Sequence, residues 1–342
     1  MAMGRCLLET GARALRCGST PAVSHLCPLR SVCFAASSTL RWGPLRSVQR
    51  HCTSAFTALE QQMWSSGAQA YAKGFGPLTA QASSTLLRCA ELLTAEGTAA
   101  SSVRDVRVLD VATGPGYVAE MAAAMSKEVV ALDFVEEMVK IAAARCVHLP
   151  NVRAVQGDAQ ALPFESGTFD AITCAFGVLH FATPQAFFNE AARVLKPGGR
   201  LGFSVWDTPQ PNSCFTVVTT AIRECGDASV PLPGGDGILP FFHFANREEV
   251  AAALCAAGFD PSSVRTEQLP LAFQLSDKHE LFEAFLRGTG RTRAVLEAQS
   301  TAQLGAIRDH MADALERDFK TTRGTYEVPA IAVVHSAATA TL

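Results

Sequence analysis

The sequence predicts an α/β fold in which a mostly parallel sheet is covered by helices on both faces. Two observations carry this prediction. Several segments have the 3.6-residue apolar spacing of helices, and short apolar runs lie between them. Such alternation is typical of parallel strands joined by helical crossovers. The runs that we expect to form strands lie near 105–111, 127–133, 151–156, 169–175 and 200–206.

The helices are predicted from apolar spacing and from their end signals. Apolar side chains recur at helical spacing in 116–126 and 135–147. A further helix is expected over 184–195, because Pro197 cannot continue it and the following glycines permit a tight turn into the next strand. An N-terminal helical segment is expected at about 58–95.

The C-terminal part adds a helix, two strands and an insertion. NREEVAAALCAAGFD, from Asn246, predicts an N-capped helix ended by Gly258, with a strand near 263–274 after it. A last apolar run lies at 326–335. The insertion between these two strands, 276–322, shows helical periodicity.

A second stretch, 207–245, is expected to be irregular because of the Pro and Gly residues in PLPGGDGILPFFHF. Loops over the carboxyl ends of parallel strands commonly determine substrate specificity. Aromatic and apolar residues of this stretch, with Met63, Trp64 and Tyr71 from the N-terminal helix, could therefore close a binding site. Packing of a lid against the sheet is the alternative, and for any single residue it is favoured slightly over contact with the substrate.

A glycine-rich turn follows the first predicted strand, in VLDVATGPG at 108–116. Gly114 and Gly116 let the backbone approach a ligand without a Cβ clash, and a helix beginning near Tyr117 offers free N–H groups. Asp133 ends the next strand about one βαβ unit downstream, where a carboxylate can accept both hydroxyl protons of a ribose. This spacing indicates adenosine binding.

Two classes of enzyme use such a turn. Gly114 to Ala119 also satisfies the G-x-G-x-x-A pattern of nicotinamide-dependent oxidoreductases, which is weak evidence alone. Asp110, directly before the turn, disfavours a pyrophosphate and favours a cationic cofactor such as S-adenosylmethionine, which carries an ammonium and a sulfonium.

Four motifs then follow in one order: DVATGPG, ALD, GDAQALPF and LKPGG. On these motifs the chain resembles the class I S-adenosylmethionine-dependent methyltransferases over about residues 64–275, and among them the small-molecule group that includes the ubiquinone and menaquinone biosynthesis C-methyltransferases. The resemblance implies a Rossmann-like sheet of seven strands whose last strand, here 326–335, is antiparallel. It also implies S-adenosylmethionine as the cofactor.

The resemblance further implies roles for single residues. It assigns to the methionine part of the cofactor Asp110, Ala112, Thr113, Gly114 and Gly116, and to the ribose hydroxyls Asp133. It places Phe134 near the adenine, Asp158 as acceptor from the adenine amino group, Ala159 as a backbone N–H donor, and Ala175 and Phe176 beside the sulfonium. Helix caps, turn chemistry and ordinary core packing are the structural alternatives for these residues.

A general base is optional in such a fold, because the methyl donor is already activated and alignment is the main requirement. His180, in FGVLHF after the strand 169–175, is the first candidate for a base, since an imidazole titrates near neutrality. His243 is a weaker candidate. A histidine that caps a helix or fills a loop is the alternative.

The first 58 residues have the composition of a transit peptide, with seven Arg, no Lys and one acidic residue, Glu9. Import into a mitochondrion is favoured, with a plastid second and a disordered cytosolic tail as the alternative. We therefore divide the chain into a disordered transit peptide, 1–57, and a methyltransferase domain, 58–342. The domain comprises a helical cap 58–100, a cofactor-binding core 101–206, the substrate loop 207–245 and a C-terminal part with the insertion 276–322.

Composition excludes several other classes. Without the transit peptide, 22 basic and 31 acidic residues remain, a net charge near −9 that disfavours a nucleic acid as substrate. No apolar run approaches the roughly 20 residues that span a bilayer, so the protein should be soluble or at most peripheral. The cysteines form no C-x-x-C pair and the histidines do not cluster, so neither a metal site nor a disulfide framework is expected.

The sequence therefore predicts methyl transfer from S-adenosylmethionine to an oxygen, carbon or nitrogen atom of a small, apolar or aromatic molecule. Two alternatives stay open: a noncatalytic accessory protein that retains the fold, and a nicotinamide-dependent oxidoreductase. The acceptor atom and the oligomeric state are not readable from the residues.

Overall fold

The computed structural model describes residues 55–93, 105–234 and 238–341. The predicted transit peptide therefore lies outside the described residues, except for its last three. Those three already belong to helix α1 (Ala55–Lys73), in which Phe56 is buried beneath the guanidinium of Arg291. The expected start of the folded part thus moves from residue 58 back to residue 55.

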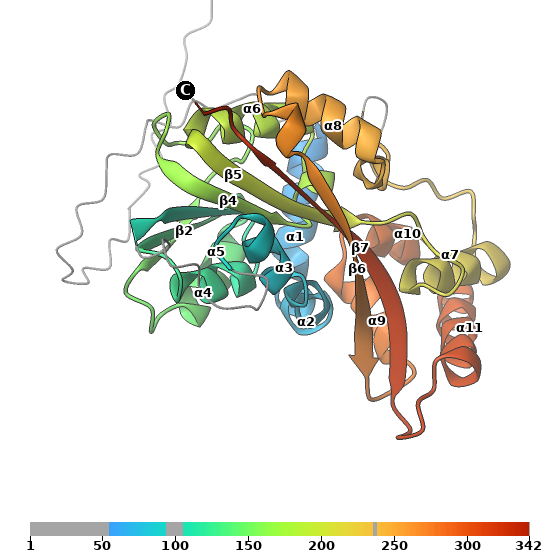
Figure 1. Ribbon diagram of the computed structural model, residues 1–342. Coiled ribbons are helices and arrows are strands. Elements are labelled where there is room, and N and C mark those ends of the chain that lie inside the picture. Colours follow the sequence, from blue (N-terminus) through green and yellow to red (C-terminus); the bar gives the residue numbers. More distant parts are fainter. Residues whose placement is uncertain (1–54, 94–104, 235–237, 342) are drawn as a thin grey trace, which may run out of the picture. The chain divides into compact units, whose positions relative to one another are not determined.

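A seven-stranded sheet forms the centre of the described part (Figure 1). Its strands are β1 (Arg107–Val111), β2 (Glu128–Asp133), β3 (Val152–Gln156), β4 (Phe169–Ala175), β5 (Leu195–Trp206), β6 (Arg265–Leu275) and β7 (Tyr326–Ala338). Their order is β3-β2-β1-β4-β5-β7-β6, and β7 is antiparallel to both of its neighbours. This confirms the predicted sheet and its antiparallel last strand. The order reverses between β1 and β4, the place where open α/β sheets bind ligands.

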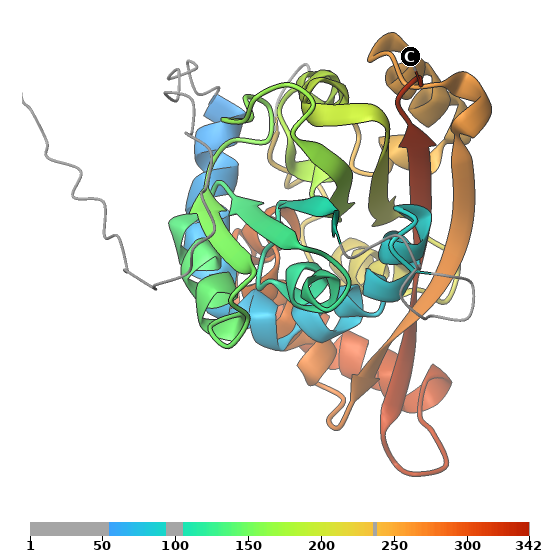
Figure 2. The ribbon, with the colours of Figure 1, turned by 60° about the vertical axis from the view of Figure 1, so that its left-hand side comes forward.

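Helices cover both faces of the sheet (Figures 1 and 2). On one face lie α3 (Ser83–Cys89), α4 (Tyr117–Ala123) and α5 (Glu136–Arg145), and on the other α6 (Pro184–Val194) and α8 (Arg247–Ala256). Strand β2 is buried along its whole length, as expected of a strand covered on both sides. Helix α8 has the predicted ends, because Asn246 accepts from the Glu248 N–H and Gly258 adopts φ +92°.

Further helices gather near the carboxyl ends of the parallel strands. They are α2 (Phe75–Ala80), α7 (Cys214–Cys225), α9 (Glu280–Gly288), α10 (Arg291–Glu297) and α11 (Thr301–Asp318). The predicted helical insertion supplies α9, α10 and α11, of which α9 packs on α1 and α11 packs on α7. Short 3₁₀ turns occur at η2 (Val178–His180), η3 (His243–Ala245) and η4 (Pro261–Ser263).

Two local expectations were wrong. The stretch 207–245 is not irregular throughout, because α7 begins after Ser213, whose side chain accepts from the Thr216 N–H. The segment PLPGGDGILPFFHF lies after this helix. The glycines after Pro197 do not form a turn ahead of β5 but a bulge inside it. Phe169 pairs with Leu195 and Ala171 with Arg200, so the extra residues loop out between these pairs.

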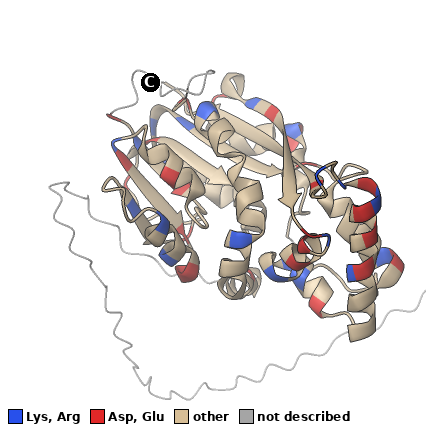
Figure 3. Cartoon of the chain, turned by 90° about the horizontal axis from the view of Figure 1, so that it is seen from below, with Lys and Arg blue, Asp and Glu red and all other residues tan. Residues whose placement is uncertain are grey.

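Acidic and basic residues are mixed along the described helices (Figure 3). Many form exposed pairs one turn apart, such as Lys140 with Glu136 and Arg287 with Glu283. Pairs of this kind contribute little to stability. No helix in the described ranges has the length and apolarity needed to cross a bilayer.

Candidate functional site

The glycine-rich turn is built on Asp110, the penultimate residue of β1. Its side chain is 1% exposed, and its two oxygens accept hydrogen bonds from Thr113 Oγ1 at 2.6 Å and Thr173 Oγ1 at 2.8 Å. Thr173 is the β4 residue in register with Asp110. Asp110 does not line the cavity described below, and its two hydrogen bonds tie the turn to β4.

Asp133 ends β2 and joins the turn to that strand. Its Oδ2 accepts from the Gly114 N–H and its Oδ1 from the Val135 N–H, both at 2.9 Å. The carboxylate is 5% exposed and lines the cavity. Each oxygen keeps a lone pair that can accept from a ribose hydroxyl. Burial raises the pKa of Asp133, and also that of Asp110, to about 6.

Gly116 has a packing role in the turn. It adopts φ +86° at the start of α4, and a Cβ there would lie 3.1 Å from Ala142 of α5. Arg145 of α5 donates to the Pro115 carbonyl and lies over the Tyr117 ring. These contacts hold the turn from its outer side, and Gly116, like Thr113, does not line the cavity.

The facing strand ends carry two strained residues. Ala112, after β1, has φ +51°, and Phe176, after β4, has φ +54°, values that non-glycine residues rarely adopt. Such strain is concentrated at functional sites. Gly177 allows these two strand ends to approach each other closely, because a Cβ there would lie only 2.6 Å from the Ala112 Cβ. The Phe176 ring stacks on Trp206 of β5 with centroids 4.2 Å apart.

A cavity of about 350 Å³ opens above these strand ends. Of the residues predicted for the cofactor, its wall includes Ala112, Gly114, Asp133, Phe134, Ala175 and Phe176. The remainder is mainly aromatic or aliphatic and comes from α1, α2, α7, the segment just before η3, and α10: Trp64, Tyr71, Phe75, Phe215, Val218, Ile222, Phe241, Phe242 and Val295. Met63, in contrast, is buried beside Gly290 and does not reach the cavity.

A smaller recess lies beside the cavity and contains the remaining predicted residues, Asp158 and Ala159. Asp158 Oδ1 accepts from the Gln160 N–H at 2.8 Å, so the side chain also shapes its own turn. Phe134 and His180 line both spaces, which makes the recess continuous with the cavity wall. The order from Gly114 past Asp133 and Phe134 to Asp158 suits an extended ligand.

His180 lies in the cavity wall and is held by residues far away in the sequence. Its Nδ1 is 3.0 Å from Oε2 of Glu60, and its ring meets that of Trp64 edge to face at 4.9 Å. Glu60 is fully buried and also binds Arg291, with Nε to Oε1 at 2.9 Å. His243, the weaker candidate, pairs with Glu249 and does not line the cavity.

Burial alone would raise the pKa of Glu60, but His180 and Arg291 together hold it below its usual value. Sequence reasoning missed Glu60, Arg291, Thr173 and Gly177. No local motif marks Glu60, since its partners His180 and Arg291 lie 120 and 231 residues away in the chain.

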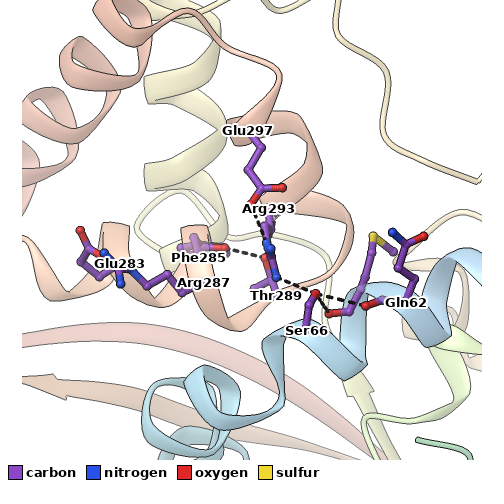
Figure 4. Close-up of polar contacts among 9 residues, drawn as sticks. Gln62, Ser66, Glu283, Phe285, Arg287, Thr289, Arg293 and Glu297 are labelled. Carbon is purple, nitrogen blue, oxygen red and sulfur yellow. Dashed lines mark hydrogen bonds and ion pairs between the residues drawn. The ribbon is translucent and has the colours of Figure 1, made fainter.

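Polar contacts anchor the insertion to α1 (Figure 4). Arg293 Nη1 donates to Ser66 Oγ at 3.0 Å, and its Nε donates to Glu297. Thr289 Oγ1 accepts from the Arg293 N–H and donates to the Phe285 carbonyl, which joins α9 to α10. The N-terminal helix and the insertion thus form one side of the cavity together. Among the described residues, no group of three His, Cys, Asp or Glu could hold a metal ion.

Comparison with known proteins agrees with this geometry. The family described as "Methyltransferase domain" matches residues 109–203. A demethylmenaquinone methyltransferase of Thermus thermophilus is 38% identical over 176 residues, which cover 48% of this chain and 77% of that protein. The chain belongs to the class I S-adenosylmethionine-dependent methyltransferases.

A second relative matches over a shorter span, and one solved structure aligns over a longer one. A demethylmenaquinone methyltransferase of Clavibacter sepedonicus is 39% identical over 111 residues, 32% of this chain and 45% of that protein. The chain thus spans about half the length of some relatives that it matches. The solved structure of the YcgJ protein from Bacillus subtilis aligns with a TM-score of 0.49 and 20% identity, over 76% of this chain and 98% of that chain.

Membership in this methyltransferase family makes S-adenosylmethionine the cofactor, and the residues fit it. Gly114 has φ +52° at the cavity wall, where a Cβ would project toward Tyr71 with only one heavy atom within 4 Å, at 3.9 Å. The turn therefore leaves space for a ligand beside its backbone. Asp133 supplies the acceptors that a ribose requires. Thr113 and Gly116 shape the turn, whereas Ala112 and Gly114 would contact the cofactor.

Proposed function

We propose that the protein transfers a methyl group from S-adenosylmethionine to an oxygen, carbon or nitrogen atom of a small, apolar or aromatic molecule. The observation that carries this proposal is the placement of the glycine-rich turn and Asp133 at one wall of a cavity whose other walls are mainly aromatic. Cofactor and acceptor would share this cavity and meet beside Phe176 and His180.

The charges at the cavity support an uncharged acceptor. Arg291 is buried and its guanidinium is bound to Glu60 and to the Leu179 carbonyl, so it is not available to a phosphate or carboxylate. Arg223 is largely exposed and pairs with Glu224. The relatives' name, demethylmenaquinone methyltransferase, makes a naphthohydroquinone the first acceptor to test.

The chemistry required of the chain is modest. When bound, S-adenosylmethionine supplies a methyl group on a sulfonium. The electron pair of the broken carbon–sulfur bond remains on sulfur. Phe176 and Trp206 exclude water from this region, and the aromatic walls orient a flat acceptor. His180 lines the cavity, and we infer that it takes the proton that an acceptor hydroxyl loses as its oxygen bonds to the methyl carbon.

Titration calorimetry of the full chain with S-adenosylmethionine and, separately, with NAD tests this proposal. We expect selective binding of S-adenosylmethionine that weakens by about 1.5–3 kcal/mol in Asp133→Ala, because a charge-assisted hydrogen bond is lost. Asp105→Ala removes an exposed carboxylate, 86% accessible, and serves as the control that leaves affinity unchanged.

Selective binding would justify an acceptor screen that begins with naphthalene-1,4-diol. Failure to bind S-adenosylmethionine, with circular dichroism showing an intact fold, would refute the enzyme proposal and favour a noncatalytic accessory protein. Binding of NAD instead would favour an oxidoreductase.

We also propose that the Arg-rich segment 1–57 directs import into a mitochondrion. Its composition supports this, with seven Arg and a single acidic residue. Fusing the segment to a fluorescent protein tests the proposal, with a control in which the Arg residues are replaced by Gln. Cytosolic fluorescence of the unmodified fusion would contradict it.

A further inference from the structure

Glu60 is unusual among the carboxylates because it is fully buried. Both of its oxygens are hydrogen-bonded, as burial of a charge requires. Oε1 accepts from Arg291 Nε at 2.9 Å. Oε2 lies 3.0 Å from His180 Nδ1 and accepts from Trp64 Nε1 at 2.8 Å. The four side chains come from α1, the 3₁₀ turn η2 after β4, and α10. The cluster thus joins three separate segments at the cavity wall.

A purely structural ion pair is the simplest explanation of this cluster. Desolvation largely cancels the attraction in a buried pair, so Glu60 and Arg291 alone would add little net stability. The third partner, His180, calls for more explanation. Arg291 Nη2 also donates to the carbonyl of Leu179, the residue before His180, so the pair fixes both the backbone and the ring of the histidine.

The hydrogen bond to Glu60 determines which ring nitrogen of His180 carries the proton. A carboxylate only accepts hydrogen bonds, so Nδ1 must be the donor, and in the neutral ring Nε2 then has a free lone pair. Nε2 forms no hydrogen bond with the described residues, while the ring lines the cavity. The T-shaped contact with Trp64 holds the ring plane.

We propose that Glu60, supported by Arg291, is a positioning residue that fixes the His180 tautomer, so that Nε2 receives the proton of the methyl acceptor. This inference rests on the proposed function. In the step, the acceptor O–H bond breaks, its oxygen bonds to the methyl carbon, and the sulfur retains the electron pair of the broken bond. The proton stays on Nε2 until product release, and solvent then removes it.

The charges around His180 suit this role. Glu60 and Arg291 neutralise each other, and the carboxylate of Asp133, at the end of β2, faces the same part of the cavity. A histidine that gains a proton therefore lies between two carboxylates, Glu60 at 3.0 Å and Asp133 further away. Both carboxylates attract the cationic ring.

Nitrogen-15 NMR of the histidine rings tests the tautomer directly in the full chain, with His180→Gln used to assign the signal. We expect Nδ1–H and a bare Nε2 in the neutral ring of the wild type. The opposite tautomer would overturn the proposal, whatever the activity. This measurement requires neither an acceptor nor a variant of Glu60.

Glu60→Gln then tests the consequence, with naphthalene-1,4-diol, kept reduced under nitrogen, as the acceptor. We expect kcat to fall roughly 10- to 100-fold, because His180 would no longer be held in the tautomer that takes the proton. The KM for the acceptor and the affinity for S-adenosylmethionine should stay within about twofold. The His180 ring should also lose its single tautomer. An unchanged kcat, despite the altered tautomer, would overturn the proposal.

Glu128→Gln is the matched control, because Glu128 is a nearly buried carboxylate that pairs with Arg107 at the opposite ends of the strands. It removes an ion pair of similar kind and should leave kcat and the His180 tautomer unchanged. Equal losses of kcat in both variants would indicate a general structural effect and contradict the positioning role. Absence of S-adenosylmethionine binding would refute the proposed function instead, and calorimetry reports it separately.

Discussion

Asp133 shows how one buried residue couples cofactor binding to pH. Burial raises its pKa to about 6, although two backbone N–H groups donate to the carboxylate and oppose that rise. The free protein therefore binds a proton at Asp133 as the pH falls through 6. A neutral carboxyl group accepts weakly from ribose hydroxyls and does not attract a cationic cofactor, so proton and cofactor compete.

We predict that the Kd for S-adenosylmethionine is nearly constant above pH 7 and rises by up to about tenfold per pH unit below 6, because binding must release the proton. In Asp133→Asn, affinity should be lower at pH 8 and the slope below pH 6 smaller. Some slope remains because the pKa of Asp110 is also about 6. Calorimetric titrations from pH 5 to 8 measure this. Equal slopes in both proteins would contradict the role of Asp133.

Most residues of the cavity wall at the strand ends were predictable, because their positions follow from backbone constraints at a strand end. A glycine at a left-handed turn, or a carboxylate that ends a strand, leaves a local mark in the sequence, as at Gly114 and Asp133. Glu60 and Arg291 leave none. Their positions depend on the packing of α1 against the insertion, and no spacing within either segment encodes that contact.

At the scale of elements, the strands were predicted well where an apolar run coincides with a buried strand, as in β2 and β4. Helix α7 was missed because the Pro and Gly residues of PLPGGDGILPFFHF led us to expect an irregular structure for the whole stretch 207–245. Its own signal was present, in Ser213 as N-cap and in the helical spacing of Phe215, Val218 and Ala221. The start of β5 was missed because sequence alone does not distinguish a bulge from a turn.

Helix α11 contains a glycine that limits its stability. Gly305 lies inside the helix without a positive φ, and a Cβ there would meet no atom within 4 Å. We predict that Gly305→Ala raises the free energy of unfolding by about 0.5–1 kcal/mol, because alanine loses less backbone entropy on folding. Urea unfolding monitored by circular dichroism measures the change.

Gly258 is the matched control for this substitution. A Cβ there would also meet nothing within 4 Å, but the residue has φ +92° at the end of α8. Gly258→Ala should therefore destabilise the protein, by about 1 kcal/mol or more, through backbone strain alone. If both variants shifted stability in the same direction, the argument from backbone conformation would be wrong.

At the scale of the whole molecule, His335 links the antiparallel edge of the sheet to the segment before α8. It is fully buried in β7. Its Nδ1 is 3.0 Å from Thr266 Oγ1 of β6, and its Nε2 is 3.0 Å from the Phe244 carbonyl. A neutral ring satisfies both partners, by accepting at Nδ1 and donating at Nε2. Burial lowers the pKa of His335 to about 4.

This lowered pKa makes global stability sensitive to acid. The unfolded chain binds a proton at His335 below pH 6.5, whereas the native protein does so only below about 4. The contribution of neutral His335 to the free energy of unfolding is therefore fully present above pH 6.5 and is lost as the pH falls toward 4. We predict that the wild type loses about 3 kcal/mol over this range relative to His335→Gln.

Urea unfolding of both proteins at a series of pH values measures the difference. The comparison between them cancels Asp110 and Asp133, whose raised pKa values act in the opposite direction, stabilising the native state as the pH falls. A difference in stability that does not vary between pH 6.5 and 4 would contradict the prediction for His335.

By itself, the sequence determined the order of the strands and of most helices, the glycine-rich turn, and the carboxylates at the carboxyl ends of β1 and β2. These features depend on apolar periodicity and on conformations that few residues adopt, so they are encoded within short windows. The tertiary structure alone decided which groups meet in the cavity. Glu60, His180 and Arg291 come together only because α1 and the insertion both pack over the carboxyl ends of the strands. Contacts between residues so far apart in the sequence arise from the burial of apolar surface over the whole fold, and no single segment encodes them.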